Sequence, residues 1–501
     1  RGGRRHPQGR KRLGEYQWPD MSNRLNIDRL RGQMRGQYLA QADQVGGYGV
    51  VRLTRLGDWG TQFGTRLAAY TRWAQDGNAD LEQDFDWAEP APEKRRTPLF
   101  RLFQLYVRFH AEEESDPAMR DEARAWFKRL EEGDAEARRL WRWFREISLR
   151  EFQRIYDRLG VSFDTLEQGE AFYEDQLVPT MQRLENAGLL VEGNNGARIV
   201  DLEDVGISTP CLVQKADGTS IYATRDLAAA LYRKEAYAFD RCLYVVGTDQ
   251  VLHFQQIFAV LDKLDPWFKG RMLHTPFGMI KLPEGKMSTR KGNVIFLEDV
   301  LDEAHERVAA IIAEKNPDLQ GKEAVAEMLG MGAVVFFDAM NDRVKPITFT
   351  WDRVIALDGD TGPYVQYAHA RIMSVLRKAG GGWAAKAQVQ SAHGPFLSYS
   401  EAQLPSQLSG LEAPEAQALL FELAGLPGAI AAVADGCMAT PLARQLVALA
   451  RSFSGYYTNC PILAPENAPE VRDARLTLCV ATARALRQGL FLMGIQAPEE
   501  M

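Results

Sequence analysis

The sequence has 501 residues, which is more than one hydrophobic core usually organises, so its length predicts two or three domains. Its composition, 46% hydrophobic and 25% charged, is that of a globular protein, and the net charge of −7 argues against a generally basic nucleic-acid-binding protein, although a local patch could still bind a polyanion. The five cysteines are scattered without a C-x-x-C pair, which supports neither a disulfide framework nor a zinc site and indicates a reducing cytoplasm.

The chain begins with a basic segment. Residues 1–36 contain ten Lys and Arg against three Asp and Glu, and no apolar stretch follows that would make a secretory leader. We expect residues 1–20 to be a basic, disordered leader, and because the first residue is Arg1 and not Met we interpret the chain as a fragment. No apolar run approaches the length that a membrane-spanning helix needs, so we expect no contact with a membrane.

The next segments alternate between strand-like and helical patterns. Residues 50–53 predict a strand with a glycine-punctuated turn after it, and residues 98–160 repeat apolar residues at helical spacing up to a C-cap glycine. Further on, CLVQKADGTSIYAT predicts a hairpin, TRDLAAALYRKEAY a helix capped by Thr224, RCLYVVGTDQ a strand and VLHFQQIFAVLDKL a helix. The succession of strand, polar loop and helix is the repeating unit of a parallel sheet that binds ligands at its strand ends.

The second half of the sequence is mostly helical. Residues 300–380 follow a helical pattern, the small residues of 378–395 predict a linker, and residues 412–492 contain amphipathic runs rich in Ala and Leu. We therefore expect an α/β domain over residues 21–360, with a helical insertion near 98–160, and an all-α domain over residues 361–501.

The loop LPEGKMSTRKGN, residues 282–293, concentrates cations and hydroxyl groups. Lys286, Arg290 and Lys291 surround Ser288 and Thr289. Such donors suit negative charge that develops on a phosphate, but the pattern G-x-x-x-x-G-K-[ST] is absent, so the loop is not a P-loop. Taken alone, it favours the interpretation of an exposed basic surface loop.

Six stretches of the chain resemble one family, in the order in which that family carries them. GDWGTQFG, YATRDLAAALYR, VVGTDQVLHFQQIF, HTPFGMIKLPEGKMSTRKGN, DGDTGPYVQYAHARI and FSGYYTNCPIL, between residues 57 and 463, are similar to arginyl-tRNA synthetases. KMSTRKGN resembles the signature loop with which class I aminoacyl-tRNA synthetases close over the ATP triphosphate. The resemblance implies a Rossmann-like class I catalytic domain with helical insertions, followed by an all-α anticodon-binding domain. We expect the family's separate N-terminal tRNA-binding domain to be missing from this chain.

The resemblance also implies site residues. They are Lys286, Ser288 and Lys291 for catalysis; Asn26, Arg29, His253, Lys286 and Met287 for ATP; Asp20, Tyr222, Asp226 and Gln250 for arginine; and Tyr456 and Tyr457 for tRNA. Asp226 would pair with the substrate guanidinium, although residue chemistry alone favours a carboxylate placed in the first turn of a helix, and His253 alone would be a helix-surface histidine. The two tyrosines could stack on unpaired loop bases or pack in the helical core, with equal weight.

One stretch, EYQWPDMSNRLNIDRLRGQ, departs from the family. Where class I synthetases carry His-x-Gly-His, this sequence has Asn26 and Arg29 at the histidine positions and Asp28 at the glycine, and Asp20 replaces an asparagine that holds the substrate. Asp28 would add bulk and a negative charge facing a polyanion, and each lost electrostatic donor of this kind costs roughly a hundred- to thousand-fold in rate. We therefore expect either a weak or inactive synthetase or an error in the sequence of residues 1–45.

The reaction that the resemblance implies is the ATP-dependent activation of arginine to arginyl-adenylate and its transfer to tRNA(Arg), in translation. Magnesium would accompany ATP, and we expect no structural metal. The expected partners are arginine, ATP and tRNA(Arg), and we expect a monomer in the cytoplasm. Two alternatives stay open: a catalytically impaired paralogue that binds tRNA or regulates another process, and a ligase that activates arginine without tRNA.

Overall fold

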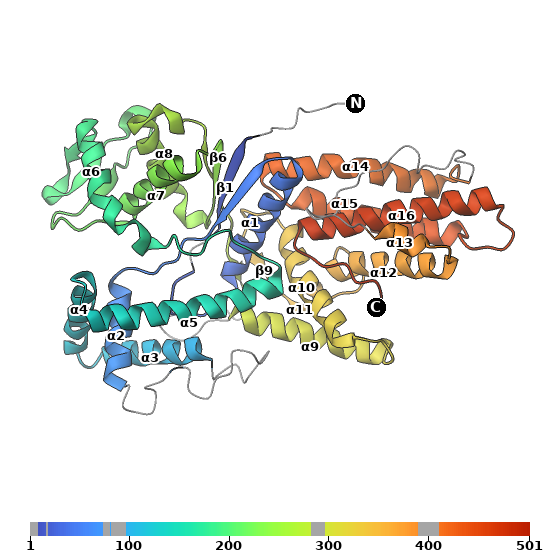
Figure 1. Ribbon diagram of the computed structural model, residues 1–501, viewed down its shortest axis with the longest axis horizontal. Coiled ribbons are helices and arrows are strands. Elements are labelled where there is room, and N and C mark those ends of the chain that lie inside the picture. Colours follow the sequence, from blue (N-terminus) through green and yellow to red (C-terminus); the bar gives the residue numbers. More distant parts are fainter. Residues whose placement is uncertain (1–8, 17–18, 74–80, 82–96, 282–295, 389–409) are drawn as a thin grey trace.

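The computed structural model describes residues 9–16, 19–73, 81, 97–281, 296–388 and 410–501, and a parallel sheet lies at its centre (Figure 1). The four strands of this sheet are β1 (Lys11–Tyr16), β2 (Gly49–Leu53), β6 (Arg241–Val245) and β7 (Met272–His274). They lie in the order β2-β1-β6-β7, and every neighbouring pair is parallel. Helix α1 (Asp28–Val45) connects β1 to β2, and α8 (Val251–Leu264) connects β6 to β7, as parallel pairing requires.

Strand β1 corrects the expectation of a disordered leader over residues 1–20 for residues 11–16, whereas residues 1–8, 17 and 18 lie outside the described part of the chain. Five of its six residues are buried, and it pairs with strands on both sides. Two of its charged side chains have partners inside the protein. Arg12 pairs with Asp43 of α1, and Glu15 pairs with Arg233; Glu15 and Arg233 are both fully buried. Charged residues in this strand are therefore compatible with a place inside the fold.

The helical insertion after β2 is confirmed. It contains α2 (Thr61–Trp73), α3 (Pro98–Glu112), α4 (Ala118–Glu131) and α5 (Ala135–Leu159), followed by the short 3-10 helix η3 (Glu170–Gln176). Gly160 ends α5 with a left-handed φ of 62°, as its expected role as a C-cap requires.

The other side of the α/β region contains α6 (Leu177–Asn186), α7 (Tyr222–Tyr237) and α8, with a small antiparallel sheet of β3 (Leu190–Glu192), β4 (Arg198–Val200) and β5 (Cys211–Gln214). The expected cap at Thr224 is wrong, because α7 begins at Tyr222 with Ile221 as its N-cap, which places Thr224 in the first turn of the helix. The Thr224 hydroxyl instead accepts a hydrogen bond from the Ile221 N–H at 3.5 Å and donates to the Val213 carbonyl.

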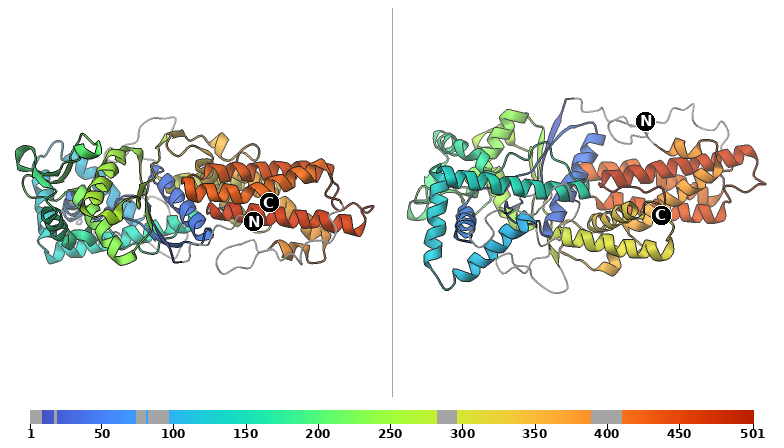
Figure 2. Two further views of the ribbon diagram at one scale, coloured as in Figure 1. Left: turned by 90° about the horizontal axis from the view of Figure 1, so that it is seen from above. Right: turned by 60° about the horizontal axis from the view of Figure 1, so that its bottom comes forward.

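The remaining elements are almost all helices. They are β8 (Ile280–Lys281), β9 (Ile347–Thr348), α9 (Leu297–Lys315), α10 (Lys322–Met340), α11 (Trp351–Val354), α12 (Gly362–Ala379), α13 (Trp383–Ala387), α14 (Pro414–Gly436), α15 (Thr440–Asn459) and α16 (Pro469–Leu492). Figure 2 shows that α12 to α16 form a bundle that extends away from the sheet and gives the molecule its elongated shape. The expected linker over 378–395 is wrong in its described part, since α13 packs on α12 and α16 there.

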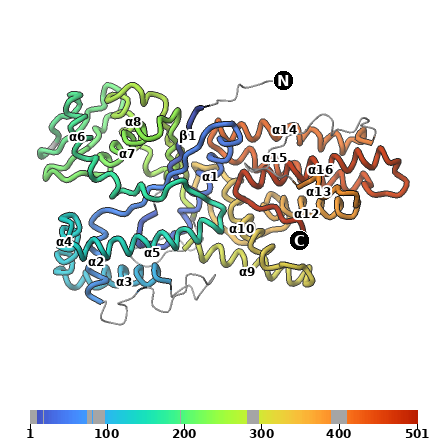
Figure 3. Tube along the Cα trace, viewed as in Figure 1, coloured from blue at the N-terminus to red at the C-terminus, as the bar shows by residue number. Residues whose placement is uncertain are grey.

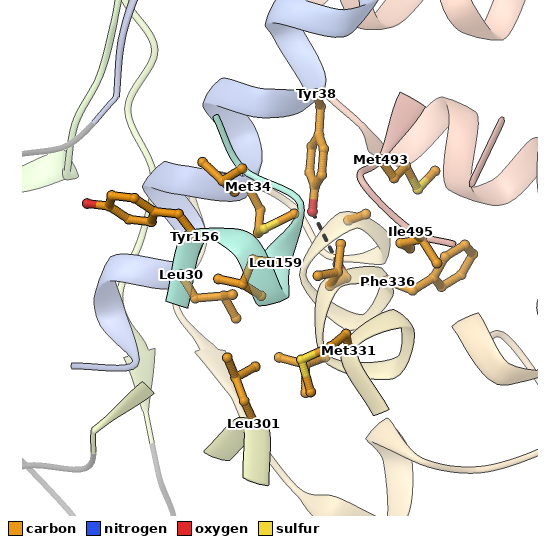
Figure 4. Packing of buried hydrophobic residues seen from close by; sticks show 14 of the residues in the cluster. Leu30, Met34, Tyr38, Tyr156, Leu159, Leu301, Met331, Phe336, Met493 and Ile495 are labelled. Carbon is orange, nitrogen blue, oxygen red and sulfur yellow. Dashed lines mark hydrogen bonds between the residues drawn. The ribbon is translucent and has the colours of Figure 1, made fainter. Parts of the chain in front are cut away.

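Helix α1 joins the α/β region to the helical bundle (Figure 4). Its residues Leu30, Met34 and Tyr38 are buried in one continuous core with side chains of α5, α9, α10 and the segment after α16. The Tyr38 hydroxyl donates to the Val335 carbonyl of α10 at 3.3 Å. Because the apolar core crosses the junction without a break, the two regions are packed as one body.

The C-terminal residues return along α12, where the trace ends (Figure 3). The Gln366 amide donates to the Gln496 carbonyl at 2.7 Å, and the His369 Nδ1 lies 2.8 Å from the Pro498 carbonyl. The end of the chain is thereby tied to the first helix of the bundle.

Helix α14 overturns the expectation about apolar runs. It has 23 residues and a mean hydropathy of 1.6 in its most apolar stretch, so by length and composition alone it could cross a membrane. Only 22% of that stretch is buried, although α14 packs along α15, and Phe421 is 77% exposed.

Candidate active site

A cavity of about 440 Å³ opens at the carboxyl ends of the central strands. Its wall takes Asp20 from the segment after β1, Gly57 from the loop after β2, Gly247 from the loop after β6 and Phe277 from the segment after β7. This edge is where open parallel sheets bind their ligands, because the strand ends and helix N-termini converge there. The cavity is therefore the candidate active site.

Most of the residues expected to bind arginine or ATP meet in this cavity. Of the seven that the structure describes, six line the wall: Asp20, Asn26, Arg29, Tyr222, Gln250 and His253. The seventh, Asp226, lies behind the wall and is only 1% exposed. We expected Tyr222 and Asp226 on one helix face. They differ sharply in exposure, because Tyr222 is 61% exposed.

Two glycines let the loops of the site pack closely. Gly57 donates its N–H to the Pro19 carbonyl at 3.0 Å, and a Cβ atom at Gly57 would lie 3.0 Å from the Asp20 carboxylate. A Cβ atom at Gly247 would lie 2.5 Å from the carboxylate of Asp249. These glycines explain why GDWG and VVGTDQ carry a small residue where an acidic side chain must reach the cavity.

The rest of the GDWG motif supports the wall from behind. The Asp58 carboxylate accepts the Ala171 N–H at 2.9 Å and the Arg145 Nε–H at 3.3 Å. The Trp141 indole donates to the Asp58 carbonyl at 2.8 Å. Asp58 therefore holds α5 and η3 in place, and η3 begins with the cavity residue Glu170.

Glu170 is a site residue that sequence reasoning missed. It lines the cavity although it is only 5% exposed, and its N–H donates to the Leu56 carbonyl at 3.0 Å. Burial raises the pKa of Glu170 to about 7, even though the positive charges of Arg55 and Arg225 oppose the rise. Nothing in the local pattern around Glu170 predicted this position, because its neighbours in space come from distant parts of the chain. Asp249 was also missed, although it lies in the quoted stretch VVGTDQ, directly before the predicted Gln250.

Asp226, which is buried, pairs with His253 of the cavity wall, although the resemblance assigned the two residues to different ligands. The His253 Nε2 lies 2.6 Å from one Asp226 oxygen, and the other oxygen pairs with the guanidinium of Arg55. Burial and the nearby charge of Arg55 lower the pKa of His253 to about 4, so the imidazole is neutral at pH 7. Because the carboxylate must accept, Nε2 carries the proton and Nδ1 is left as an acceptor.

The stretch that the resemblance predicts to depart from the family supplies Asp20, Asn26, Asp28 and Arg29 to the wall of the cavity. Arg29 Nη2 lies 3.1 Å from the Asp20 carboxylate, so two residues expected to bind different substrates form an ion pair. The Asp28 carboxylate accepts the N–H of Ile280 at 3.0 Å, and burial raises the pKa of Asp28 against the opposing effects of that N–H and of neighbouring arginines. Asp28 thereby fixes strand β8, directly before residue 282.

The cavity is acidic. Among the lining residues that the structure describes, Asp20, Asp28, Glu170 and Asp249 carry carboxylates, and Arg29 carries the one guanidinium. Such a wall attracts a cationic ligand and repels a polyanion. A triphosphate bound here would need additional cations.

Lys286 and Lys291, which are expected to supply those cations, lie outside the described part of the chain. The same holds for Met287 and Ser288, which the resemblance also assigns to the site. The residues that flank this segment lie at the cavity: Met279 lines its wall, and Phe296 forms a backbone bridge with the lining residue Asn26.

The two tyrosines expected to bind tRNA differ in position. Tyr456 is fully buried in the helical core, so its proposed stacking on a base is wrong for this structure. Tyr457 is 36% exposed, and the guanidinium of Arg371 lies 4.3 Å from its ring centroid. Tyr457 remains a candidate surface for a base.

Comparison with known proteins places this geometry in a family. The model described as "tRNA synthetases class I (R), catalytic domain" matches residues 2–351, and the "DALR anticodon binding domain" model matches residues 365–501. The chain belongs to the class I arginyl-tRNA synthetase family. An arginine--tRNA ligase of Streptococcus equi subsp. equi is 42% identical over 494 residues, which cover 99% of this chain and 81% of that protein. One of Clostridium perfringens is 40% identical with the same coverage.

Solved structures confirm the predicted fold class. The arginyl-tRNA synthetase of Thermus thermophilus matches with a TM-score of 0.79 and 24% identity, covering 98% of this chain and 82% of that one. The arginyl-tRNA synthetase of Plasmodium falciparum matches with a TM-score of 0.76 and 21% identity, covering 98% of this chain and 77% of that one. The architecture is thus a class I catalytic domain with a parallel sheet, followed by a helical anticodon-binding domain.

Proposed function

We propose that this chain is an arginine–tRNA ligase of the cytoplasm that activates arginine with ATP and transfers it to tRNA(Arg). The observation that supports this best is the acidic cavity at the carboxyl edge of the sheet, because a cationic amino acid is the ligand that its carboxylates favour. Relatives named arginine--tRNA ligase, at 40–42% identity over almost the whole chain, support the same conclusion.

We assign the arginine side of the cavity to Glu170, Asp20, Tyr222 and Gln250, which all line it. The ionised form of Glu170 would meet the guanidinium, and the exposed phenol of Tyr222 would cover the aliphatic part of the substrate. Asp226 supports this side from behind the wall.

We assign the nucleotide side to Asn26, Arg29 and His253, with Lys286, Met287, Ser288 and Lys291 brought in from the segment between Met279 and Phe296. The ends of that segment support this assignment, because both lie at the cavity. The two lysines would neutralise the acidic wall and hold the phosphates while charge develops on them.

In the first step, a carboxylate oxygen of arginine attacks the α-phosphorus of ATP, and pyrophosphate leaves to give arginyl-adenylate. In the second step, the terminal hydroxyl of the tRNA attacks the arginyl carbonyl carbon, and AMP leaves. ATP enters as its Mg²⁺ complex, and the phosphates themselves supply ligands to the ion. In the part of the chain that the structure describes, no three His, Cys, Asp or Glu side chains converge as a metal site.

Arginine-dependent exchange of pyrophosphate into ATP, with and without tRNA(Arg), tests this proposal. Exchange together with arginylation of tRNA would support it. Exchange without any arginylation would favour a ligase that does not use tRNA. Binding of tRNA(Arg) without exchange would favour the impaired paralogue.

The loop lysines provide a sharper test of the nucleotide side. Lys286→Ala and Lys291→Ala should slow adenylate formation more than they weaken arginine binding, because their charges act on the phosphates in the transition state. Lys263→Ala is the matched control, since that lysine pairs with Asp204 away from the cavity. Equal damage to both quantities would contradict the assignment of the loop.

A further inference from the structure

Arg55 places a guanidinium directly behind the arginine side of the cavity. It lies in the loop after β2 and is fully buried. Its Nη1 pairs with Asp226, and its Nη2 lies 3.9 Å from the Glu170 carboxylate. An internal cation thus sits between two buried carboxylates, of which Glu170 lines the cavity and Asp226 lies behind its wall.

The carboxylate of Asp226 has both oxygens engaged. One pairs with Arg55, and the other accepts from the His253 imidazole at 2.6 Å. Asp226 is 1% exposed and, like Arg55, does not line the cavity, so an incoming ligand reaches its carboxylate only if the wall rearranges. Glu170 faces both ways, toward the cavity and toward Arg55.

The side chain of Arg55 carries the same functional group as the substrate of the proposed function. A guanidinium binds carboxylates through its planar fork of N–H groups, and a second guanidinium competes for those same oxygens. We propose that Arg55 is a built-in competitor of the substrate: its guanidinium occupies the site between Asp226 and Glu170, and arginine binds fully only when Arg55 is displaced. This inference rests on the proposed function, because it names the residue that sets the affinity for the substrate.

The proposal predicts weak binding of free arginine. If the chain exposes Asp226 in only about one molecule in ten, the apparent affinity falls about tenfold, because affinity scales with the population of the competent state. Removing the guanidinium of Arg55 should raise the affinity for arginine by the same factor. The side chain that replaces Arg55 must be uncharged and of similar length, so that the wall of the cavity keeps its shape.

Arg55→Met is the variant that meets these conditions, and calorimetric titration with free arginine is the measurement. We expect the dissociation constant to fall about tenfold or more, and Asp226→Asn added to Arg55→Met should abolish the gain. Citrulline, which lacks the positive charge, should gain nothing. Arg233→Met is the matched control, because Arg233 forms a buried pair with Glu15 and does not line the cavity. An unchanged or weaker arginine affinity in folded Arg55→Met would overturn the proposal.

The crystal structure of the unmodified chain soaked in arginine tests the proposal even if Arg55→Met does not fold. Arginine at Asp226 with Arg55 swung away would support it. Arginine bound in the cavity while Arg55 still pairs with Asp226 would overturn it.

Pyrophosphate exchange separates this inference from the proposed function. If the unmodified chain binds arginine as tightly as Arg55→Met does and exchanges normally, the competition is refuted while the function stands. If Arg55→Met binds arginine tightly but neither protein exchanges, the competition stands and the function fails.

Discussion

The structure changes what a substitution of Asp226 should do. The resemblance implies that Asp226 pairs with the substrate guanidinium, so its loss would abolish arginine binding. In the structure it neutralises the buried Arg55, and removing one partner of a buried pair leaves an uncompensated charge. The first consequence is therefore a loss of stability.

We predict that Asp226→Asn lowers the free energy of unfolding by about 3–5 kcal/mol, measured by urea denaturation. Asp204→Asn is the control, because its pair with Lys263 is exposed and contributes roughly 0–1 kcal/mol. Equal, small effects of both substitutions would show that Arg55 finds another partner or becomes hydrated.

Glu170 should make arginine binding depend on pH. Its pKa of about 7 means that the carboxyl group loses its proton near neutrality, and the resulting carboxylate attracts the cationic ligand. We predict that arginine affinity rises between pH 6 and pH 8, and that Glu170→Gln lowers the affinity and removes most of this dependence. Calorimetry across this range measures both, and an unchanged slope in the variant would assign the proton to another group.

At the scale of elements, the start of α1 is where the resemblance predicts a departure from the family. Asn26 and Arg29, which that resemblance sets at two histidine positions, line the cavity, and Asp28, set at the glycine position, binds the backbone of β8. The Asp28 carboxylate thus has a structural partner in addition to its effect on the charge of the cavity.

We predict that Asn26→His, Asp28→Gly and Arg29→His together raise arginine-dependent pyrophosphate exchange by roughly a hundredfold or more. The pair Asn26→His and Arg29→His, with Asp28 kept, should gain less but stay more stable, because the bond to the Ile280 N–H is retained. If the pair gains as much as the triple change, the charge of Asp28 does not hinder the nucleotide.

The sequence predicted the elements that a local pattern defines. The prediction failed where contacts between distant residues determine the structure. The helices of the insertion and the helix VLHFQQIFAVLDKL could be recognised from periodicity, and the latter coincides with α8. Strand β1 was missed because its charged residues pair with distant helices, which composition cannot reveal. In the site, motifs led to six cavity residues, but Glu170 and Arg55 had no local signal because burial and ion pairs across the fold place them there.

At the scale of the whole molecule, the two regions share one core through α1, and the end of the chain is fixed on α12. Substitutions that weaken the packing of the bundle should therefore lower the stability of the whole chain and should not release a separate domain. His369 lies at this attachment and makes it sensitive to acid.

His369 is fully buried, and its Nδ1–H donates to the Pro498 carbonyl at 2.8 Å. Its Nε2 is buried without a hydrogen-bond partner among the described residues, so a second proton there would find no acceptor. Burial lowers the pKa of His369 to about 4, against about 6.5 in an unfolded chain. The unfolded state therefore binds more protons between these values, and the stabilising contribution is complete above pH 6.5 and lost as the pH falls toward 4.

We predict that this loss appears as a difference between the unmodified chain and His369→Asn, whose amide can keep the bond to Pro498 but does not titrate in this range. Urea unfolding at pH 4.5, 5.5, 6.5 and 7.5 measures it. The advantage of the unmodified chain should be constant above pH 6.5 and should decline below it by up to about 1.4 kcal/mol per pH unit. Comparing the two proteins is necessary because Glu170, with its raised pKa, contributes in the opposite sense. A difference that stays constant down to pH 4.5 would mean that His369 takes up its proton in the folded state, and that the attachment of the chain end opens before the molecule unfolds.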